Sequence, residues 1–437
     1  MNSVWTESTS LPEFSQLKKD IKTDVLIIGG GIAGILTAYF LHQSGVKYIL
    51  VEKSRICGCT TKNTTAKITY QHGLIYHKIL KIHGTEIAEK YLKANKSAFE
   101  KYAKICRNID CDYETKDNYV YSANNRNLLE NEITALNKIG FSAEFCENIP
   151  LPFDTVGAVK FKNQAQFNPL KFLSAIAKNL NIYEYTFVKE MVGNTAVTEC
   201  AKIHADKVIV TTHFPFINKH GSYFLKLYQH RSYVIALEKA QNIDGMYVDE
   251  NRNGLSFRNY DNLLLLGGGS HRTGKNGGNW SELRHFANRN YPDSKEKFSW
   301  ATQDCMSLDG MPYIGQYSKS TPNLFVASGF NKWGMTGAMV SAMVLSDMAT
   351  EKSNDFADVF NPSRNVLQPQ LFINAVEATK NLLTISQKRC PHLGCALKWN
   401  KSEHSWDCPC HGSRFSENGK VLDNPANGNV VNLRKLK

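Results

Sequence analysis

Apolar and polar positions near the start of the chain predict a strand, a helix and a second strand. Residues 23–31, TDVLIIGGG, form an unbroken apolar run that ends in glycines, and residues 47–54, KYILVEKS, contain another. Such runs are typical of strands buried on both faces. Between them, IAGILTAYFLHQSG carries apolar residues at helical spacing and ends at Gly45, a usual helix stop. This β-α-β unit has the length of a parallel dinucleotide-binding motif.

The pattern further along predicts a second, sheet-based domain. Residues 70–147 are mostly helical in character, most clearly at 88–109. Between residues 161 and 266, strand-like pieces such as KVIVTT, RSYVIALE and NLLLLGGG alternate with polar loops. We place an α+β substrate subdomain at about residues 150–270. Residues 323–349 then predict a strand, a glycine-rich loop and a helix, and the polar, proline-containing residues 352–370 predict a linker.

Composition and charge limit the classes of function. With 437 residues and 42% hydrophobic residues, the chain has room for two or three globular domains. Its formal net charge of +12 can attract nucleic acid, an anionic membrane or an acidic redox protein, but Lys and Arg are spread along the chain. We therefore expect no nucleic-acid partner. No apolar run is long enough to span a membrane, and no signal peptide is recognisable, so we expect a cytoplasmic protein.

The glycines of the first turn form a phosphate-binding signature. Gly29, Gly31 and Gly34 give G-x-G-x-x-G between the first strand and the helix. They allow a tight turn, close approach of a pyrophosphate to the backbone, and close packing of the helix on the strand. The helix N-terminus favours the anion. Glu52, at the end of the second strand, is placed to bind ribose hydroxyls.

Two further segments indicate which dinucleotide binds. LVEKSRICGCTTKNTTAKIT at residues 50–69, and DGMPYIGQ with the glycine-rich loop at 323–349, resemble the D-amino-acid oxidase and dehydrogenase superfamily, which includes glycine and sarcosine oxidases. The resemblance implies an FAD-binding Rossmann-type α/β domain. It also implies residues that contact FAD: Gly29, Gly31, Ala33, Gly34, Glu52, Lys53, Thr64, Thr65, Gly334, Met335 and Thr336. A helix N-terminus at Gly334 would stabilise the negative charge of a reduced flavin.

The substrate side departs from the superfamily pattern. Where its members commonly carry W-x-x-x-R-P-x-x-x-D-G, with Arg holding a carboxylate, this chain has WATQDCMSLDG, which places Asp304 at the Arg position. Either Asp304 holds a cationic amine or the pocket is built differently. Other candidates for facing the substrate are polar or aromatic residues of the second domain and of the glycine-rich loop: Arg231, Tyr233, His271 and Trp333. Each has an equally simple structural role, and the catalytic residues stay unassigned.

The C-terminal part contains a cysteine and histidine motif. CPHLGC at residues 390–395 and CPCHGS at 408–413 each contain one Cys–His pair and one further Cys. Two Cys and two His can bind zinc, but zinc sites commonly pair C-x-x-C with a helical H-x-x-x-H. The two loops resemble those of Rieske [2Fe–2S] domains. The resemblance implies ligation by Cys390, Cys408, His392 and His411, and a disulfide between Cys395 and Cys410.

Neighbouring residues bear on the cluster's potential and its support. Ser413 matches the family's hydrogen-bond donor to a sulfide, whereas Phe415 replaces a frequent Tyr donor, so we predict a midpoint below that of respiratory Rieske proteins. A Rieske domain usually has a longer strand-rich base than this chain offers before Cys390. We expect a small all-β domain within residues 366–437, with strands at LLTISQK and after Gly419, whose cluster loops rest on the flavin domain of residues 1–365.

Together these features predict an FAD-dependent oxidoreductase that oxidises an amine or an amino-acid-like C–N bond. FAD would take two electrons as a hydride, and the Rieske cluster would pass single electrons to an external protein. Two alternatives are a reductase with reversed electron flow and a non-catalytic redox sensor or electron-transfer adaptor. The seven cysteines outside the cluster motif are scattered without an even framework, which suggests reduced thiols.

Overall fold

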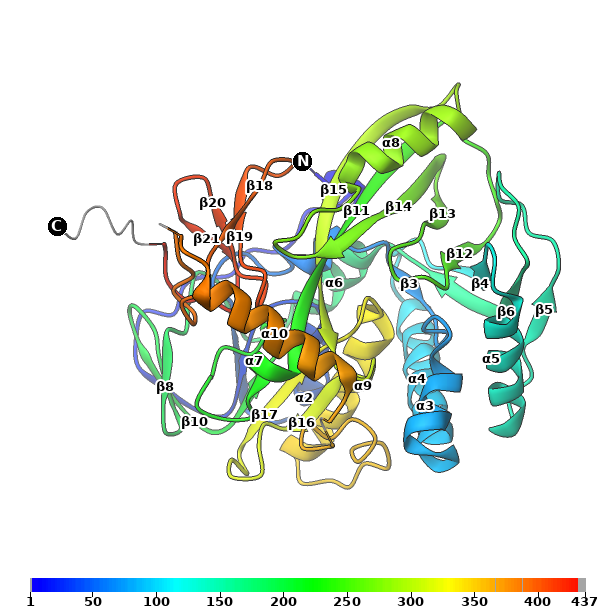
Figure 1. Cartoon of the computed structure of the whole chain (residues 1–437). Helices are drawn as coiled ribbons and strands as arrows, with labels where there is room; N and C mark the ends of the chain where they lie inside the picture. The colour runs from blue at the N-terminus through cyan, green and yellow to red at the C-terminus, as the bar shows by residue number, and fades with distance from the viewer. Residues whose placement is uncertain (1, 366, 387, 431–437) are drawn as a thin grey trace.

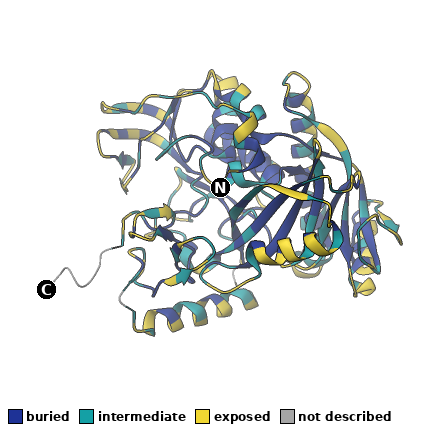
Figure 2. Ribbon diagram, turned by 90° about the horizontal axis from the view of Figure 1, so that it is seen from above, coloured by how far each residue is buried: buried dark blue, intermediate teal, exposed yellow. Residues whose placement is uncertain are grey.

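The computed structural model describes residues 2–365, 367–386 and 388–430 and arranges them around three β-sheets (Figure 1). The sheets contain eight, nine and four strands. Buried residues follow the strands, and exposed residues concentrate on the outer helices and loops (Figure 2). None of the described helices is long and apolar enough to cross a membrane.

The eight-stranded sheet contains the predicted dinucleotide-binding unit. β1 (Ile21–Ile28) pairs in parallel with β2 (Tyr48–Val51) and with β10 (Lys202–Val210). Val25 and Ile27 join one apolar cluster, while Leu26 and Ile28 join another. Both faces of β1 are therefore covered, as its unbroken apolar run predicts. The sheet is completed by β7 (Ile182–Tyr183), β8 (Glu190–Val192), β9 (Thr195–Val197), β16 (Tyr313–Gln316) and β17 (Leu324–Ser328).

Two helices of this sheet begin at the predicted glycine-rich turns. α2 (Ile32–Gln43) follows β1, and α9 (Gly334–Ala349) follows β17. The two helices pack against each other, which brings segments three hundred residues apart onto one face of the sheet. The strand, loop and helix predicted for residues 323–349 are confirmed.

The nine-stranded sheet forms the second layer and is mostly antiparallel. β11 (Leu227–Glu238) lies between β14 (Leu263–Arg272) and β15 (Lys295–Ser307). Successive residues of a strand point to opposite faces, so alternate side chains of β11 lie on the two faces of the sheet. The other strands are β3 (Lys67–Ile68), β4 (Glu114–Ser122), β5 (Glu144–Cys146), β6 (Gly157–Gln166), β12 (Met246–Asp249) and β13 (Ser256–Tyr260).

The strands of the two sheets do not follow the range of about 150–270 expected for the substrate subdomain. KVIVTT, assigned to the second domain, is part of β10 in the dinucleotide-binding sheet, where Val208 pairs with Leu26 of β1. β4 lies within the segment expected to be mostly helical. Apolar periodicity identifies a buried strand but does not say which sheet it joins, because that depends on pairing across long sequence separations.

Helices cover the sheets. The helix expected at residues 88–109 is α4 (Thr85–Cys106), and it packs against α3 (Ile75–His83) and α9. The remaining ones within residues 2–365 are α1 (Val4–Ser8), the 3-10 turn η1 (Thr60–Asn63), α5 (Arg126–Lys138), α6 (Pro169–Ala177), α7 (Tyr223–Lys226) and α8 (Asn279–Asn290).

The C-terminal part begins with a helix and ends in the smallest sheet. α10 (Pro369–Leu383) lies across the front of the molecule in Figure 1. The strand expected at LLTISQK is wrong for its described residues: Leu382 and Leu383 are the last two residues of α10, because the helical spacing that starts at Pro369 continues through them. Four short antiparallel strands follow: β18 (Lys398–Asn400), β19 (Ser405–Asp407), β20 (Arg414–Ser416) and β21 (Val421–Asp423). The strand after Gly419 is confirmed as β21.

Candidate functional site

The glycines after β1 form a close-packed turn. Gly29 has a φ of 115°, a conformation that L side chains rarely adopt. A Cβ on Gly34 would lie 1.9 Å from the carbonyl oxygen of Gly29, so only glycine lets α2 approach the turn. A Cβ on Gly31 would meet one atom within 4 Å, the Thr61 hydroxyl at 3.3 Å. The turn therefore leaves room beside Gly31, as a bound pyrophosphate requires.

The start of α2 has free hydrogen-bonding capacity for an anion. Gly31 at the N-cap has no side chain, so the Thr61 hydroxyl takes up one of the first N–H groups of α2, that of Ile32, at 3.1 Å. The other N–H groups of the first turn have no partner within the helix. The Glu52 carboxylate accepts from the Gly30 N–H at 2.7 Å and from the Ser54 N–H at 3.0 Å. These bonds hold the carboxylate beside the glycine turn. The residues present fit the ADP half of FAD.

Not all residues predicted to contact FAD line this turn in the same way. Ala33 is buried in the first turn of α2. Lys53 turns toward the C-terminal part, where its Nζ donates to the Leu422 carbonyl at 3.4 Å. The Thr64 carbonyl accepts from the Trp5 indole N–H at 2.7 Å, and the Thr65 carbonyl accepts from Arg258 at 2.7 Å. The loop of Thr64 and Thr65 is thus held in place from two sides.

The second glycine-rich loop contains an aromatic contact that the sequence did not reveal. Gly334, Met335 and Thr336 form the first turn of α9, again without a side-chain cap. A Cβ on Gly334 would meet nothing closer than Phe330 at 4.0 Å, so space lies beside this turn. His72 bonds the Thr336 hydroxyl through Nε2 at 2.8 Å and stacks on Trp333 with ring centroids 5.1 Å apart. Burial lowers the pKa of His72 to about 3, so its imidazole is neutral.

Three of the substrate-side candidates converge on the C-terminal part of the chain. Arg231 donates from Nε to the Glu403 carboxylate at 2.9 Å and forms a buried ion pair with it. The Tyr233 hydroxyl donates to the same carboxylate at 2.9 Å and lies 3.1 Å from Nε2 of His271. These side chains hold the cluster domain against β11 and β14, and the interpretation of Arg231 as a structural ion pair is the one that the contacts favour.

The opposite face of β11 carries positive charge. His230 pairs directly with Asp304 of β15 and with Arg272 of β14, but the guanidinium of Arg272 reaches the C-terminal part of the chain, where it donates to the Pro409 carbonyl. Lys332, two residues before the α9 turn, donates to the Ser270 hydroxyl at 3.0 Å and to the Arg252 carbonyl at 2.9 Å. The set His230, Arg252 and Lys332, called the cationic face below, was not found from the sequence because its members come from three separate segments.

Hydrogen bonds and electrostatics define the cationic face. Ser270 donates to Ser232, which donates to the Asp304 carboxylate, each at 3.1 Å. Arg252 donates to the Tyr228 hydroxyl at 3.2 Å. Burial, then the charges of Lys332 and Arg252, lower the pKa of His230 to about 3. Its Nδ1 is buried and has no partner within the described residues. The surface thus offers two cationic side chains and one carboxylate beside the α9 turn.

The two cysteine and histidine loops lie against each other. Each loop is closed by a bond to its first cysteine carbonyl: the Gly394 N–H donates to Cys390, and the Gly412 N–H donates to Cys408, both at 2.9 Å. Cys390 and Cys408 are both buried, and the thiol of Cys408 lowers the pKa of Cys390. The predicted disulfide between Cys395 and Cys410 is confirmed.

The histidines of these loops are arranged for ligation. The rings of His392 and His411 lie 4.9 Å apart, and Nδ1 of each is buried without a partner in the described part of the chain. Burial lowers the pKa of His392 to about 4 and that of His411 to about 3, so both imidazoles are neutral. Two adjacent thiols and two neutral, unpartnered imidazoles fit the ligand set of a Rieske cluster.

The flavin domain supplies part of the support for these loops. From β11 and β15, Gln229 donates to the His411 carbonyl and Gln303 donates to the Gly412 carbonyl, both at 2.8 Å. Arg272 donates to the Pro409 carbonyl at 3.0 Å. His392 contacts the Asn218 side chain through Nε2 at 3.0 Å. The nine-stranded sheet therefore supports the cluster loops in place of a longer strand-rich base, as we predicted from the short segment before Cys390.

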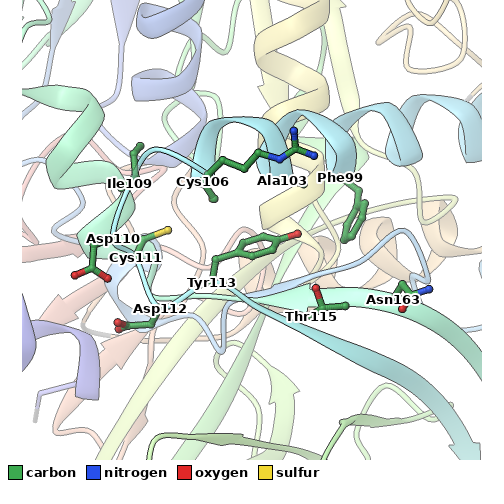
Figure 3. Close-up of a pocket in the computed structure, with 11 residues that line it drawn as sticks. Phe99, Ala103, Cys106, Ile109, Asp110, Cys111, Asp112, Tyr113, Thr115 and Asn163 are labelled. Atoms are coloured by element: carbon green, nitrogen blue, oxygen red, sulfur yellow. The ribbon is translucent and has the colours of Figure 1, made fainter.

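A cavity of about 690 Å³ lies away from both sites, between the end of α4, the loop that follows it and β4 (Figure 3). Cys106 and Cys111 are among the residues that line it. None of the residues predicted to contact FAD or the cluster lies on its wall. The cavity is therefore separate from the candidate site.

Two protein families match this chain, one over the dinucleotide-binding part and one over the part with the cysteine and histidine loops. Residues 24–348 match the family of FAD dependent oxidoreductases, and residues 348–434 match the Rieske [2Fe-2S] domain. The chain belongs to the FAD-dependent oxidoreductase family and carries a C-terminal Rieske domain, so its cofactors are FAD and a [2Fe–2S] cluster. The domain boundary at residue 365 and the cytoplasmic location stay predictions.

Individual relatives agree with this assignment. The putative Rieske 2Fe-2S iron-sulfur protein YhfW of Bacillus subtilis is 35% identical, over 97% of this chain and 96% of the relative. The cytochrome b6-f complex iron-sulfur subunit of Nostoc punctiforme is 54% identical over 37 residues, 8% of this chain and 21% of the relative. Among solved structures, glycine oxidase from Geobacillus kaustophilus has a TM-score of 0.65 at 18% identity, over 79% of this chain and 99% of that one. L-proline dehydrogenase from P. horikoshii has a TM-score of 0.67 at 16% identity, over 79% and 98%.

Proposed function

We propose that this FAD-dependent oxidoreductase oxidises the C–N bond of a small amino-acid-like substrate and passes the electrons singly to an external acceptor. FAD, when bound, supplies hydride acceptance, and the [2Fe–2S] cluster, when bound, supplies one-electron transfer. The structural neighbours named as glycine oxidase and proline dehydrogenase support this substrate class as a likeness of fold.

The main support for the proposal is that strand β11 contributes residues to both the cationic face and the contact with the cluster domain. Its His230 side belongs to the cationic face beside the α9 turn, and its Gln229 and Arg231 hold the cluster domain on the other side. Layers packed on a sheet lie only about 10 Å from it. A single strand between the two sites supports direct transfer from the flavin side to the cluster side.

The cationic face supports an anionic substrate group. Arg252 and Lys332 would bind a carboxylate, in place of the Arg that the superfamily motif lacks here. Asp304 would accept a hydrogen bond from the substrate amine, since Ser232 already orients its Oδ2 at 3.1 Å. An amino acid with its two groups held in this way presents its Cα–H in a fixed orientation, which is the main requirement for hydride transfer.

Gly29, Gly31, Ala33, Gly34, Glu52, Thr64, Thr65 and the α9 turn remain our proposed contacts for FAD. Cys390, Cys408, His392 and His411 remain our proposed ligands of the cluster. His72 is a positioning residue in this proposal, because it fixes Thr336 and Trp333 at the start of α9.

Anaerobic mixing with amino acids and simple amines tests the proposal. We expect flavin absorbance to bleach first and the electron paramagnetic resonance signal of the reduced cluster to follow, with zwitterionic amino acids more effective than amines that lack a carboxylate. Bleaching of the flavin without a cluster signal would show that the cluster does not accept electrons from the flavin. No bleaching with any amine, together with reduction of the flavin by a reduced cluster, would instead support reversed electron flow.

A further inference from the structure

The segment that joins the two domains exposes an unusual amount of apolar surface. Among the described residues, thirteen large hydrophobic side chains are exposed, and seven of them lie between residues 367 and 385. They are Leu367, Phe372, Ile373, Val376, Leu382, Leu383 and Ile385, and we call them the α10 stripe. Such concentration in one short segment marks an interaction surface, because single exposed apolar residues are normally scattered.

α10 is anchored to the protein by its other face. Asn374 and Asn381 are buried, and Arg272 donates to the Asn374 side chain at 2.9 Å. Lys275 pairs with Glu377 at 2.6 Å. The helix lies along the edge of the molecule with its outer residues exposed (Figure 2). With 15 residues it presents a straight, convex ridge about 22 Å long.

The charge around the α10 stripe is positive. Glu377 is the one acid of the helix, and Lys275 neutralises it, while Lys380 is exposed on the helix. Lys388 and Arg389 follow the helix but are half-buried: Lys388 lies over the Trp406 ring, and Arg389 donates to backbone carbonyls. The whole chain has a formal net charge of +12. An apolar ridge with basic residues beside it is the pattern of a helix that lies in the plane of a membrane interface.

We propose that the α10 stripe docks on the surface of an anionic lipid bilayer, with its apolar side chains in the boundary between headgroups and acyl chains. Phosphatidylglycerol-type headgroups match the exposed Lys380 and the net positive charge of the chain, and each Lys or Arg near such a surface adds to binding. A second copy of this chain is a poorer occupant, because it brings the same positive charge to the contact.

Docking in this way would bring the end of α10, and the first cluster loop bonded to it, close to the bilayer surface. The Ala396 N–H donates to the Asn381 carbonyl at 2.9 Å, and Arg389 donates to the Leu382 carbonyl at 3.2 Å and to the Gly394 carbonyl at 2.7 Å. Leu393, next to His392, is 41% exposed and lies at the same end of α10.

Sedimentation of the holoprotein with vesicles tests the proposal. We expect binding to vesicles of equal parts phosphatidylcholine and phosphatidylglycerol, much weaker binding to phosphatidylcholine alone, and release by salt. Val376→Glu should weaken binding at least about tenfold, because it buries a charge where an apolar group was. Val192→Glu is the matched control, since Val192 on β8 is 60% exposed and Val376 is 69% exposed.

Flavin and iron content verify that each variant is folded, and Phe372→Glu provides a second substitution on the stripe. Equal binding to both kinds of vesicle, or equal loss in Val376→Glu and Val192→Glu, would overturn the proposal. Failure of the wild-type holoprotein to sediment, combined with a dimer that Val376→Glu dissociates, would assign the stripe to a second copy of the chain instead.

Discussion

Glu403 is the residue through which the structure most directly links the two domains. Its carboxylate accepts from Arg231 and Tyr233, both at 2.9 Å, and from Arg414 at 2.8 Å. The side chains of Arg231, Glu403 and Arg414 are 4%, 9% and 8% exposed. Replacement of Glu403 by Gln keeps the shape and removes the charge that compensates two buried guanidinium groups.

The expected loss of stability depends on which ion pairs Arg231 and Arg414 retain without the Glu403 charge. Arg414 retains ion pairs with Asp407 and Asp423, whereas Arg231 has no other carboxylate partner within the described residues. Breaking a buried pair from one side costs about 3–5 kcal/mol. Because only one cation is left unpaired, we expect Glu403→Gln to lose about 3 kcal/mol, mostly as undocking of the cluster domain.

Two measurements check this prediction. The denaturant midpoint of the cluster's visible circular dichroism should fall, and flavin-to-cluster electron transfer should slow at least tenfold, while the rate of flavin bleaching by substrate stays unchanged. Glu296→Gln is the control, since its pair with Arg284 is 27% and 49% exposed and is worth about 1 kcal/mol at most. A loss below about 1 kcal/mol in Glu403→Gln, the value of an exposed pair, would refute the reasoning.

The same group predicts a pH dependence. Burial by itself would raise the pKa of Glu403, but the charges of Arg231 and Arg414 outweigh it and lower the pKa. Because the folded pKa lies below the unfolded value of about 4.3, the stabilisation is fully present above that pH. It is lost as the pH falls through the folded pKa, so cluster undocking should occur on acidification. In Glu403→Gln this acid transition should be reduced.

Four further changes test the two sites. Arg252→Met should raise KM for an amino acid at least about tenfold through loss of a charge-assisted hydrogen bond, with flavin content unchanged, measured by steady-state kinetics. Gly34→Ala should abolish FAD binding, because its Cβ would lie 1.9 Å from the Gly29 carbonyl oxygen, and absorbance of the purified protein measures this. His411→Ala should remove iron and the cluster's resonance signal but leave the flavin, as metal analysis will show. Phe415→Tyr should raise the cluster midpoint in a redox titration, since a hydroxyl adds a hydrogen bond toward ligand sulfur; an unchanged midpoint would contradict the role given to Phe415.

The features predicted most successfully from the sequence are those in which a few neighbouring residues carry the physical constraint. Gly29, Gly31 and Gly34 predict a tight turn, in which Gly29 and Gly34 leave no space for a side chain. The two cysteine and histidine loops contain their ligand types within six positions each. The strand expected at LLTISQK failed because Leu382 and Leu383 belong to a helical repeat that begins at Pro369. KVIVTT was recognised as a strand but assigned to the other sheet.

The sequence by itself determined the local chemistry: a dinucleotide turn, a flavin-type second loop and a Rieske ligand motif. Tertiary structure alone decided how these parts meet. Arg231 and Tyr233 hold the cluster domain rather than line the cationic face, and Arg252 and Lys332 gather beside the α9 turn from distant segments. The physical reason is the two-residue period of β11. It sends neighbouring side chains to opposite faces, and which partner covers each face depends on long-range pairing that no local pattern encodes.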